Sequence, residues 1–219
     1  MNKLVCLILC MFVGTVNATF INNGSFETGS FNGWTTQDLS TPFYPVQVVG
    51  SGVSPGFGLF LSSPTDGNFA AVNGFDGGGP GVISLSQNIT VDSSSTILFD
   101  YRAGWDMLNF GGSTLNRLFD VNINSLGGPN LANFNILSAA AGTINLDTGN
   151  MTGSVDLSGF VGQTVNISFE WMIPENFTGP AFFQLDNVTS TASVPEPLSI
   201  AILGFGLAGV ALSRKKKVV

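Results

Sequence analysis

The chain has 219 residues, with seven basic and fourteen acidic side chains, two cysteines, no histidine and a formal net charge of −7 at pH 7. Without histidine, the usual nucleophile–base pairs of hydrolases and the usual zinc sites cannot be assembled. Carboxylates remain as the groups for chemistry, and they suit a glycosidase or a calcium site.

The first residues, 1–18, have the pattern of a secretory signal peptide. A basic residue is followed by the apolar run Leu4–Val13 and then by the small residues of Val16–Ala18. We expect this segment to form a signal helix, to engage the secretory translocon and to be removed by signal peptidase. Cys6 and Cys10 leave with it, so the mature chain has no thiol for a disulfide, a nucleophile or a metal site.

Residues 19–193 form the predicted ectodomain. This part of the chain contains two basic residues, Arg102 and Arg117, and thirteen acidic residues, so its net charge is −11. A nucleic-acid partner is excluded, because phosphate binding depends on Lys and Arg. We expect both arginines to pair with neighbouring carboxylates such as Asp100, Asp106 or Asp120.

The ectodomain reads as a series of short strands separated by Gly, Asn, Asp, Ser and Pro. Apolar and polar residues alternate in each strand, as in strands that bury one face, and this predicts an all-β sandwich of two sheets. In the last strand, Phe183 and Leu185 share one face with Asn187, and Val188 lies on the other. The predicted strands are Val82–Ile89, Ile97–Tyr101, Phe119–Ile123, Val165–Trp171 and Phe183–Val188.

Three segments resemble galactose-binding-like jelly rolls, a fold to which many carbohydrate-binding modules belong. They are NGSFETGSFNGW (Asn23–Trp34), VDLSGFVGQTVNISFEW (Val155–Trp171) and FQLDNV (Phe183–Val188). The resemblance implies a jelly-roll β-sandwich used for sugar binding. The same fold also serves purely structural roles.

The resemblance further implies a structural calcium ion where the two ends of the jelly roll meet. Its ligands would include Glu27 of the opening segment and Asp186 of the closing strand. Calcium takes six to eight oxygen ligands, and an acidic domain gains from neutralising two close carboxylates. The alternative is that Glu27 is a turn residue and Asp186 an edge-strand charge.

Trp105 is the candidate for stacking on a sugar ring, because it follows a strand and begins the polar loop Asp106–Asn116. The alternative is that Trp105 closes the core. Thirteen acidic residues would bring some carboxylates together by chance, so the sequence nominates no catalytic pair.

The C-terminal tail, residues 194–219, has three ordered parts. They are the triplet Pro195, Glu196 and Pro197, the apolar run Leu198–Leu212, and the basic cluster of Arg214, Lys215, Lys216 and Lys217. As a helix the apolar run would be about 23 Å long, which makes a short transmembrane helix. The basic cluster would stay in the cytoplasm.

This order resembles the sorting tail of PEP-CTERM proteins, which are exported by bacteria and processed by a membrane exosortase. An ordinary tail anchor is the alternative. We expect an exported protein that is transiently anchored in the inner membrane and then lies on the cell surface or in the extracellular matrix of a biofilm. There it would be a non-catalytic exopolysaccharide-binding or structural protein; the alternative is a carboxylate-dependent glycan hydrolase or lyase.

Overall fold

The computed structural model describes residues 21–40, 44–73, 78–91, 96–110 and 113–191. The predicted signal helix and the predicted transmembrane helix at 198–212 lie outside these residues. No helix in the described part of the chain is long and apolar enough to cross a membrane.

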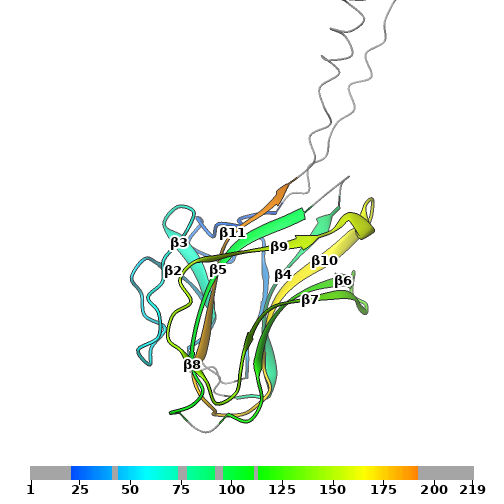
Figure 1. Ribbon diagram of the computed structural model, residues 1–219. Helices are drawn as coiled ribbons and strands as arrows, with labels where there is room; N and C mark the ends of the chain where they lie inside the picture. Colours follow the sequence, from blue (N-terminus) through cyan, green and yellow to red (C-terminus); the bar gives the residue numbers. More distant parts are fainter. Residues whose placement is uncertain (1–20, 41–43, 74–77, 92–95, 111–112, 192–219) are drawn as a thin grey trace, which may run out of the picture. The chain divides into compact units, whose positions relative to one another are not determined.

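The described residues form two antiparallel sheets (Figure 1). The first has five strands, in the order β1 (Thr35–Gln37), β4 (Gly81–Thr90), β10 (Thr164–Ile173), β6 (Arg117–Ser125) and β7 (Asn130–Ala139). The second has the order β2 (Gln47–Gly50), β3 (Phe69–Asn73), β11 (Ala181–Thr191) and β5 (Thr96–Asp106), and both β8 (Ile144–Asn145) and β9 (Met151–Asp156) pair with β5. One 3-10 turn, Ser158–Phe160, precedes β10.

The chain passes repeatedly from one sheet to the other, so strands that are neighbours in sequence often lie in different layers. Strand β10, for example, lies between β4 and β6, whereas the strand that follows it, β11, lies between β3 and β5. The predicted all-β sandwich is therefore confirmed. The outer edges of the sheets are β1 and β7 in the first, and β2 and β8–β9 in the second.

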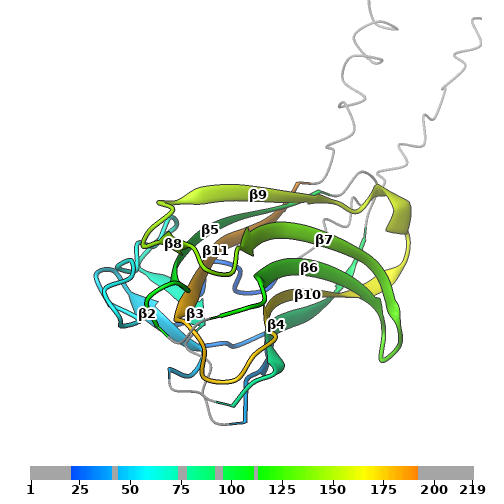
Figure 2. The same cartoon turned by 60° about the horizontal axis from the view of Figure 1, so that its bottom comes forward.

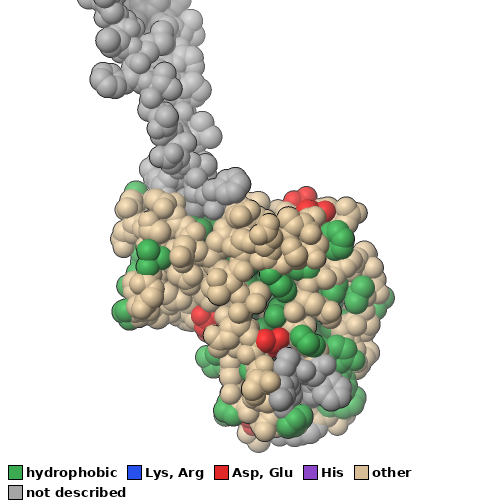
Figure 3. All heavy atoms as spheres, turned by 180° about the vertical axis from the view of Figure 1, so that it is seen from behind, with side chains coloured by type: hydrophobic (Ala, Val, Ile, Leu, Met, Phe, Trp, Pro, Cys, Tyr) green, Lys and Arg blue, Asp and Glu red, His purple; other side chains and the backbone are tan. Residues whose placement is uncertain are grey.

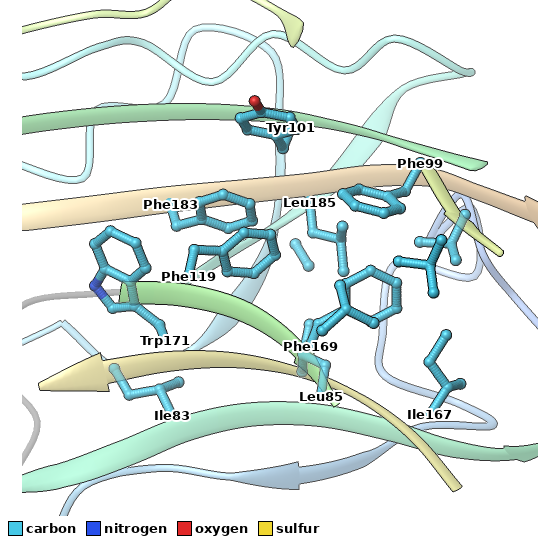
Figure 4. Close-up of a cluster of buried hydrophobic side chains, with 14 of the residues drawn as sticks. Ile83, Leu85, Phe99, Tyr101, Phe119, Ile167, Phe169, Trp171, Phe183 and Leu185 are labelled. Carbon is cyan, nitrogen blue, oxygen red and sulfur yellow. The ribbon is translucent and has the colours of Figure 1, made fainter. Parts of the chain in front are cut away.

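The core lies between the sheets and is filled by the apolar positions of the alternating strands. Figure 4 shows its aromatic centre, in which rings from β5, β6, β10 and β11 meet. Phe119 of β6 is stacked on Phe183 of β11, with ring centroids 3.5 Å apart, and so joins the two sheets directly. Phe169 meets Phe99 edge-to-face at 5.1 Å. The alternation that the sequence indicates in these strands is confirmed by the burial of Ile97, Phe99, Tyr101, Phe119, Val121, Ile123, Val165, Ile167, Phe169, Trp171, Phe183 and Leu185.

The prediction for the end of the last strand is wrong. A bulge interrupts the pairing of β11 with β5 between Asp186 and Thr189, and Asn187 adopts a left-handed conformation with φ of 50°. The extra residue shifts the alternation by one. Val188 consequently points into the core and is 2 % exposed, instead of sharing a face with Asp186.

The outer faces of the two sheets differ. On the six-stranded sheet, Phe182 of β11 packs with Leu59 and Phe60 of the long loop between β2 and β3 and with Tyr44, which makes a second, smaller apolar cluster. The outward positions of the five-stranded sheet are mostly polar, and none of them belongs to an apolar cluster. The surface seen in Figure 3 is mostly uncharged, with isolated acidic side chains.

Because Phe119 joins the sheets, we expect Phe119→Ala to lower the free energy of unfolding by about 3–5 kcal/mol, through lost burial and the cavity left behind. Urea denaturation of the purified protein measures this change. Leu126→Ala is the control, since Leu126 is 54 % exposed and its truncation should change the stability by less than about 0.5 kcal/mol. Equal effects of the two substitutions would contradict the assignment of Phe119 to the core.

Candidate functional site

The outer face of the five-stranded sheet, here called the polar face, carries amide, hydroxyl and carboxylate side chains in cross-strand rows. The register places Asn166 of β10 between Asn88 and Asn124, and Ser168 between Ser86 and Asn122. The next row has Glu170 between Ser84 and Asp120. Strands β1 and β7 extend the rows at both ends with Thr35, Gln37, Asn130, Asn133 and Asn135.

Hydrogen bonds between these side chains fix their orientation. Asn135 Nδ2 donates to Asp120 Oδ1 at 2.7 Å, and Asn133 Nδ2 donates to Asp120 Oδ2 at 3.0 Å. Asn133 Nδ2 also lies 2.7 Å from Asn122 Oδ1. Asp120 thus has an amide donor on each carboxylate oxygen, which holds it as an acceptor. The amide oxygens of Asn133 and Asn135 keep their capacity to accept hydrogen bonds from a ligand.

An open depression of about 400 Å³ lies at the β1–β4 end of the polar face, lined by Asn22, Gly33, Thr35, Ser86, Gln87 and Asn88. Gln87 fixes the position of the N-terminal segment that forms one wall of this depression. Its Oε1 accepts from the backbone N–H of Asn22 at 2.7 Å, and its Nε2 donates to the carbonyl oxygens of Asn22 and Gly33, both at 3.0 Å. The N-terminal segment is therefore fixed beside the outward residues of β4.

Sequence reasoning did not single out this face. Its signal is present in the outward positions of β10 and β6, where Asn166, Ser168, Glu170, Asp120 and Asn122 alternate with core residues. Such positions also suit any solvated sheet. Only the strand order, which brings these strands together with β4 and β7, turns them into one surface.

The predicted calcium ligands, Glu27 and Asp186, both contact the segment 65–69. Asp186 Oδ2 accepts from the backbone N–H groups of Thr65 at 2.6 Å and Asp66 at 3.1 Å. Glu27 Oε1 accepts from the backbone N–H groups of Asn68 and Phe69, both at 2.8 Å. The two carboxylates therefore fasten this segment at successive positions.

These residues meet the requirements of a calcium site in part. Asp186 is fully buried, and burial raises its pKa although hydrogen bonds from the segment act in the opposite direction. A bound cation would favour its charged form. The described residues, however, contain no group of three or more His, Cys, Asp or Glu side chains that could hold a metal. Backbone carbonyls and water would have to complete the coordination, and the calcium ion stays a prediction.

Trp105 lies inside β5 and does not begin a loop, because the strand continues to Asp106. The ring belongs to the core cluster and is 8 % exposed, and its Nε1 donates to Thr143 Oγ1 at 2.9 Å. This burial leaves little of the ring for a sugar and agrees with the alternative, a residue that closes the core.

The two ectodomain arginines have partners other than those expected from the sequence. Arg102 Nε donates to Asp147 Oδ1 at 2.8 Å, and this hydrogen bond lowers the pKa of Asp147. Arg117 is fully buried, and its Nη2 donates to the carbonyl oxygen of Thr178 at 2.6 Å. The pairing of Arg102 depends on a loop that returns to β5, a contact that sequence distance does not reveal.

The comparison with protein families concerns the tail. Residues 193–215 match the PEP-CTERM protein-sorting motif. The chain carries a PEP-CTERM sorting motif. The match includes Pro195, Glu196 and Pro197 and the predicted apolar run, so this part of the sequence prediction is confirmed. The PEP-CTERM motif implies an exported protein and processing by an exosortase. No curated protein matches the chain.

The β-sandwich is similar in fold to a solved carbohydrate-binding module. TmCBM61, solved in complex with β-1,4-galactotriose, is 14 % identical, and the match has a TM-score of 0.50 and covers 80 % of this chain and 99 % of that one. A non-crystalline cellulose-specific module, CBM28, is 11 % identical with a TM-score of 0.48 over 78 % and 94 % of the two chains. The arabinose-bound MgGH51 α-L-arabinofuranosidase is 15 % identical with a TM-score of 0.44, over 80 % of this chain and 27 % of that one. The likeness to TmCBM61 shows the fold and confirms the predicted jelly-roll sandwich.

If calcium binds between Glu27 and Asp186, it will raise the melting temperature, because a ligand that binds only the folded state stabilises it by about 2.7 kcal/mol at a hundred times its Kd. Melting curves of the exported protein with calcium and with chelator measure the shift. The variants Glu27→Gln and Asp186→Asn should abolish it, and Asp38→Asn is a matched carboxylate control away from segment 65–69. Equal melting temperatures with calcium and chelator would eliminate the ion, and a shift that survives both variants would place it elsewhere.

Proposed function

We propose that the protein is an exported, non-catalytic carbohydrate-binding protein and that a glycan binds on the polar face. The observation that carries this proposal is the continuous array of amide and hydroxyl groups on the five strands of the sheet, with an open depression at one end. The similarity in fold to TmCBM61 is consistent with this function.

The chemistry of the polar face suits sugar hydroxyls, which both donate and accept hydrogen bonds. Asparagine offers two donors and an acceptor carbonyl, and serine and threonine offer one donor and an acceptor. The orientation of several amides is already fixed by hydrogen bonds such as that from Asn166 Nδ2 to Asn88 Oδ1 at 2.9 Å, so less conformational entropy is lost on binding. The depression of about 400 Å³ is within the usual range for small-ligand sites.

The charges of the polar face favour a neutral glycan. Asp120 and Glu170 are its acidic residues, and its rows contain no Lys or Arg. Anionic polysaccharides would be repelled by these carboxylates, with a strength that depends on ionic strength. Neutral sugars would not be repelled by these carboxylates.

The alternative function, a glycan hydrolase or lyase, would depend on two carboxylates on opposite sides of a bond. Asp120 and Glu170 are directly opposite in the β6–β10 register and are the pair on the polar face that could serve. Asp120 is 7 % exposed and both of its oxygens accept amide hydrogen bonds, so little of this carboxylate is open to a substrate. This arrangement favours binding over acid–base catalysis.

A glycan array with the exported protein, followed by titration of the best ligand, tests the proposed function. Ser86→Ala together with Asn88→Ala should weaken binding at least about tenfold, since each lost hydrogen bond is worth about 1 kcal/mol. Ser154→Ala, an exposed change on β9 of the other sheet, is the matched control and should leave affinity unchanged. The same sugars are assayed for new reducing ends.

Turnover that disappears in Asp120→Asn with Glu170→Gln would overturn the binding-only proposal in favour of hydrolysis. An array without any bound sugar would leave a structural role. Binding that is lost equally in the Ser154→Ala control would exclude the polar face as the site.

We further propose the route by which the protein reaches its place of action. It would pass the secretory translocon, lose its signal to signal peptidase, and be held in the inner membrane by Leu198–Leu212 with Arg214–Lys217 in the cytoplasm. Exosortase would then act near Pro195–Pro197, and the protein would join the exopolysaccharide at the cell surface. The support is the PEP-CTERM match at residues 193–215 and the charge asymmetry around the apolar run.

Mass spectrometry of the protein recovered from the cell surface tests this route. We expect a chain that begins near Thr19 and lacks the residues after the Pro195–Pro197 triplet. Protein from a strain without exosortase activity is the control and should retain the basic cluster. Recovery of an intact C-terminus at Val219 from normal cells would contradict processing and favour an ordinary tail anchor.

A further inference from the structure

Strand β7 is the outermost strand of the five-stranded sheet, beyond β6 (Figure 2). It is ten residues long, whereas the other described edge strands β1, β2, β8 and β9 have three, four, two and six residues. On one side its backbone pairs with β6. The other side therefore presents a row of backbone N–H and C=O groups that can pair with a further strand.

The devices that usually protect such an edge are mostly missing from β7. Its sequence, NLANFNILSA, has no charged residue and no proline, the two features that commonly prevent edge-to-edge pairing. Two register shifts, at Leu131 and Ile136, are the exception. Between them Ala132–Asn135 pairs regularly with β6, so a regular stretch of edge remains.

The sequence of β7 is nearly palindromic about Phe134. Outward from this residue, Asn133 is matched by Asn135, then Ala132 by Ile136, Leu131 by Leu137, and Asn130 by Ser138. In an antiparallel pair, residues opposite each other lie on the same face. Over the central residues Ala132–Ile136 this symmetry makes the edge complementary to a second copy of itself, as a two-fold interface requires. Further out the bulges break the match of faces, because Leu137 lies opposite the core residue Phe119 whereas Leu131 is 44 % exposed.

We propose that β7 pairs antiparallel with β7 of a second copy of this chain, about a two-fold axis at Phe134. Asn133 then lies opposite Asn135 of the second copy, on the outer side of the joined sheet. Phe134 lies opposite its own copy on the inner side, where it already packs against the core. The two five-stranded sheets become one sheet of ten strands.

The distribution of charge supports a second copy as the partner. Two ectodomains with a net charge of −11 each repel one another wherever acidic surfaces face each other. Along β7 no charged residue is present, so pairing at this edge places no like charges opposite each other. Hydrogen bonds and apolar contact supply the attraction.

Pairing would also change the polar face. Asn133 and Asn135 belong to it through their contacts with Asp120, so the polar faces of the two copies would meet at the axis and continue across it. A polymer could then contact both copies at once, which raises avidity without any new contact. The dimer itself does not depend on glycan binding, and its test contains no glycan.

Sedimentation equilibrium of the exported protein over a range of concentrations tests the pairing. In the variant Asn133→Lys with Asn135→Lys, each new lysine would face a lysine of the second copy, at two symmetry-related places. In Asn133→Lys with Asn135→Glu, each lysine would face a glutamate. Both variants lose the same hydrogen bonds to Asp120. The charge at position 135 beside Asp120 differs between them, so a melting curve of each variant checks that both are folded.

We expect the native protein to dimerise and the lysine–lysine variant to dissociate with a Kd at least about tenfold higher than that of the lysine–glutamate variant. The difference should shrink at high salt, where exposed charges are screened. A native protein that is monomeric at every concentration would overturn the proposal. Dimers of equal stability in both variants would overturn it as well, because they would place the interface away from Asn133 and Asn135.

Discussion

The stacked rings of Phe119 and Phe183 come from different sheets, with centroids 3.5 Å apart. Around them lie Tyr101, Phe169 and Trp171, and each has a ring centroid within 6.3 Å of one of the two (Figure 4). The described residues contain no cysteine and a single ion pair. The separation of the sheets is thus set by aromatic packing, which is close and directional. When the inward side chains of β4, β6 and β10 are packed into this core, the alternate side chains of these strands must point outward. These outward side chains form the polar face.

The excess of carboxylates has a structural use in this framework. Many of them accept hydrogen bonds from backbone N–H groups of turns: Asp38 from Val46, Asp106 from Asn109, Asp156 from Ser158, Glu175 from Thr114 and Asp186 from Thr65. Hydrogen bonds to a charged acceptor are stronger than neutral ones. For Glu175, the bonds from Thr114 lower the pKa, so they are fully present at neutral pH and are lost as the pH falls through this lowered value. Loops that lack disulfides are fastened to the sandwich in this way.

The sequence was sufficient for the inner layer of the fold, because alternation in β5, β6 and β10 reports directly which side of each strand is buried. The alternation failed at the bulge in β11, where one extra residue shifts the inward and outward positions. The left-handed Asn187 moves Val188 into the core, and nothing in the alternation marks a bulge. The sequence also failed for contacts that depend on strand order. The resemblance brought Glu27 and Asp186 together, yet their shared partner, segment 65–69, lies in a part of the chain without a matching motif. The polar face likewise requires that β10 lie between β4 and β6, which local patterns do not specify.

The asparagines on β6 and β7 keep these strands polar without adding charge, which matters both for solubility and for contact with a ligand or a second copy. An acidic domain stays soluble through self-repulsion, but the same repulsion opposes a polyanionic ligand and a second copy. Asn122, Asn133 and Asn135 keep the outer side of these strands polar and hydrogen-bonded without adding charge. The carboxylate among them, Asp120, is 7 % exposed and is covered by two of these amides. Charge is therefore concentrated at turns, where it fastens loops, and is kept low on the surface where neutral partners would be recognised by hydrogen bonds alone.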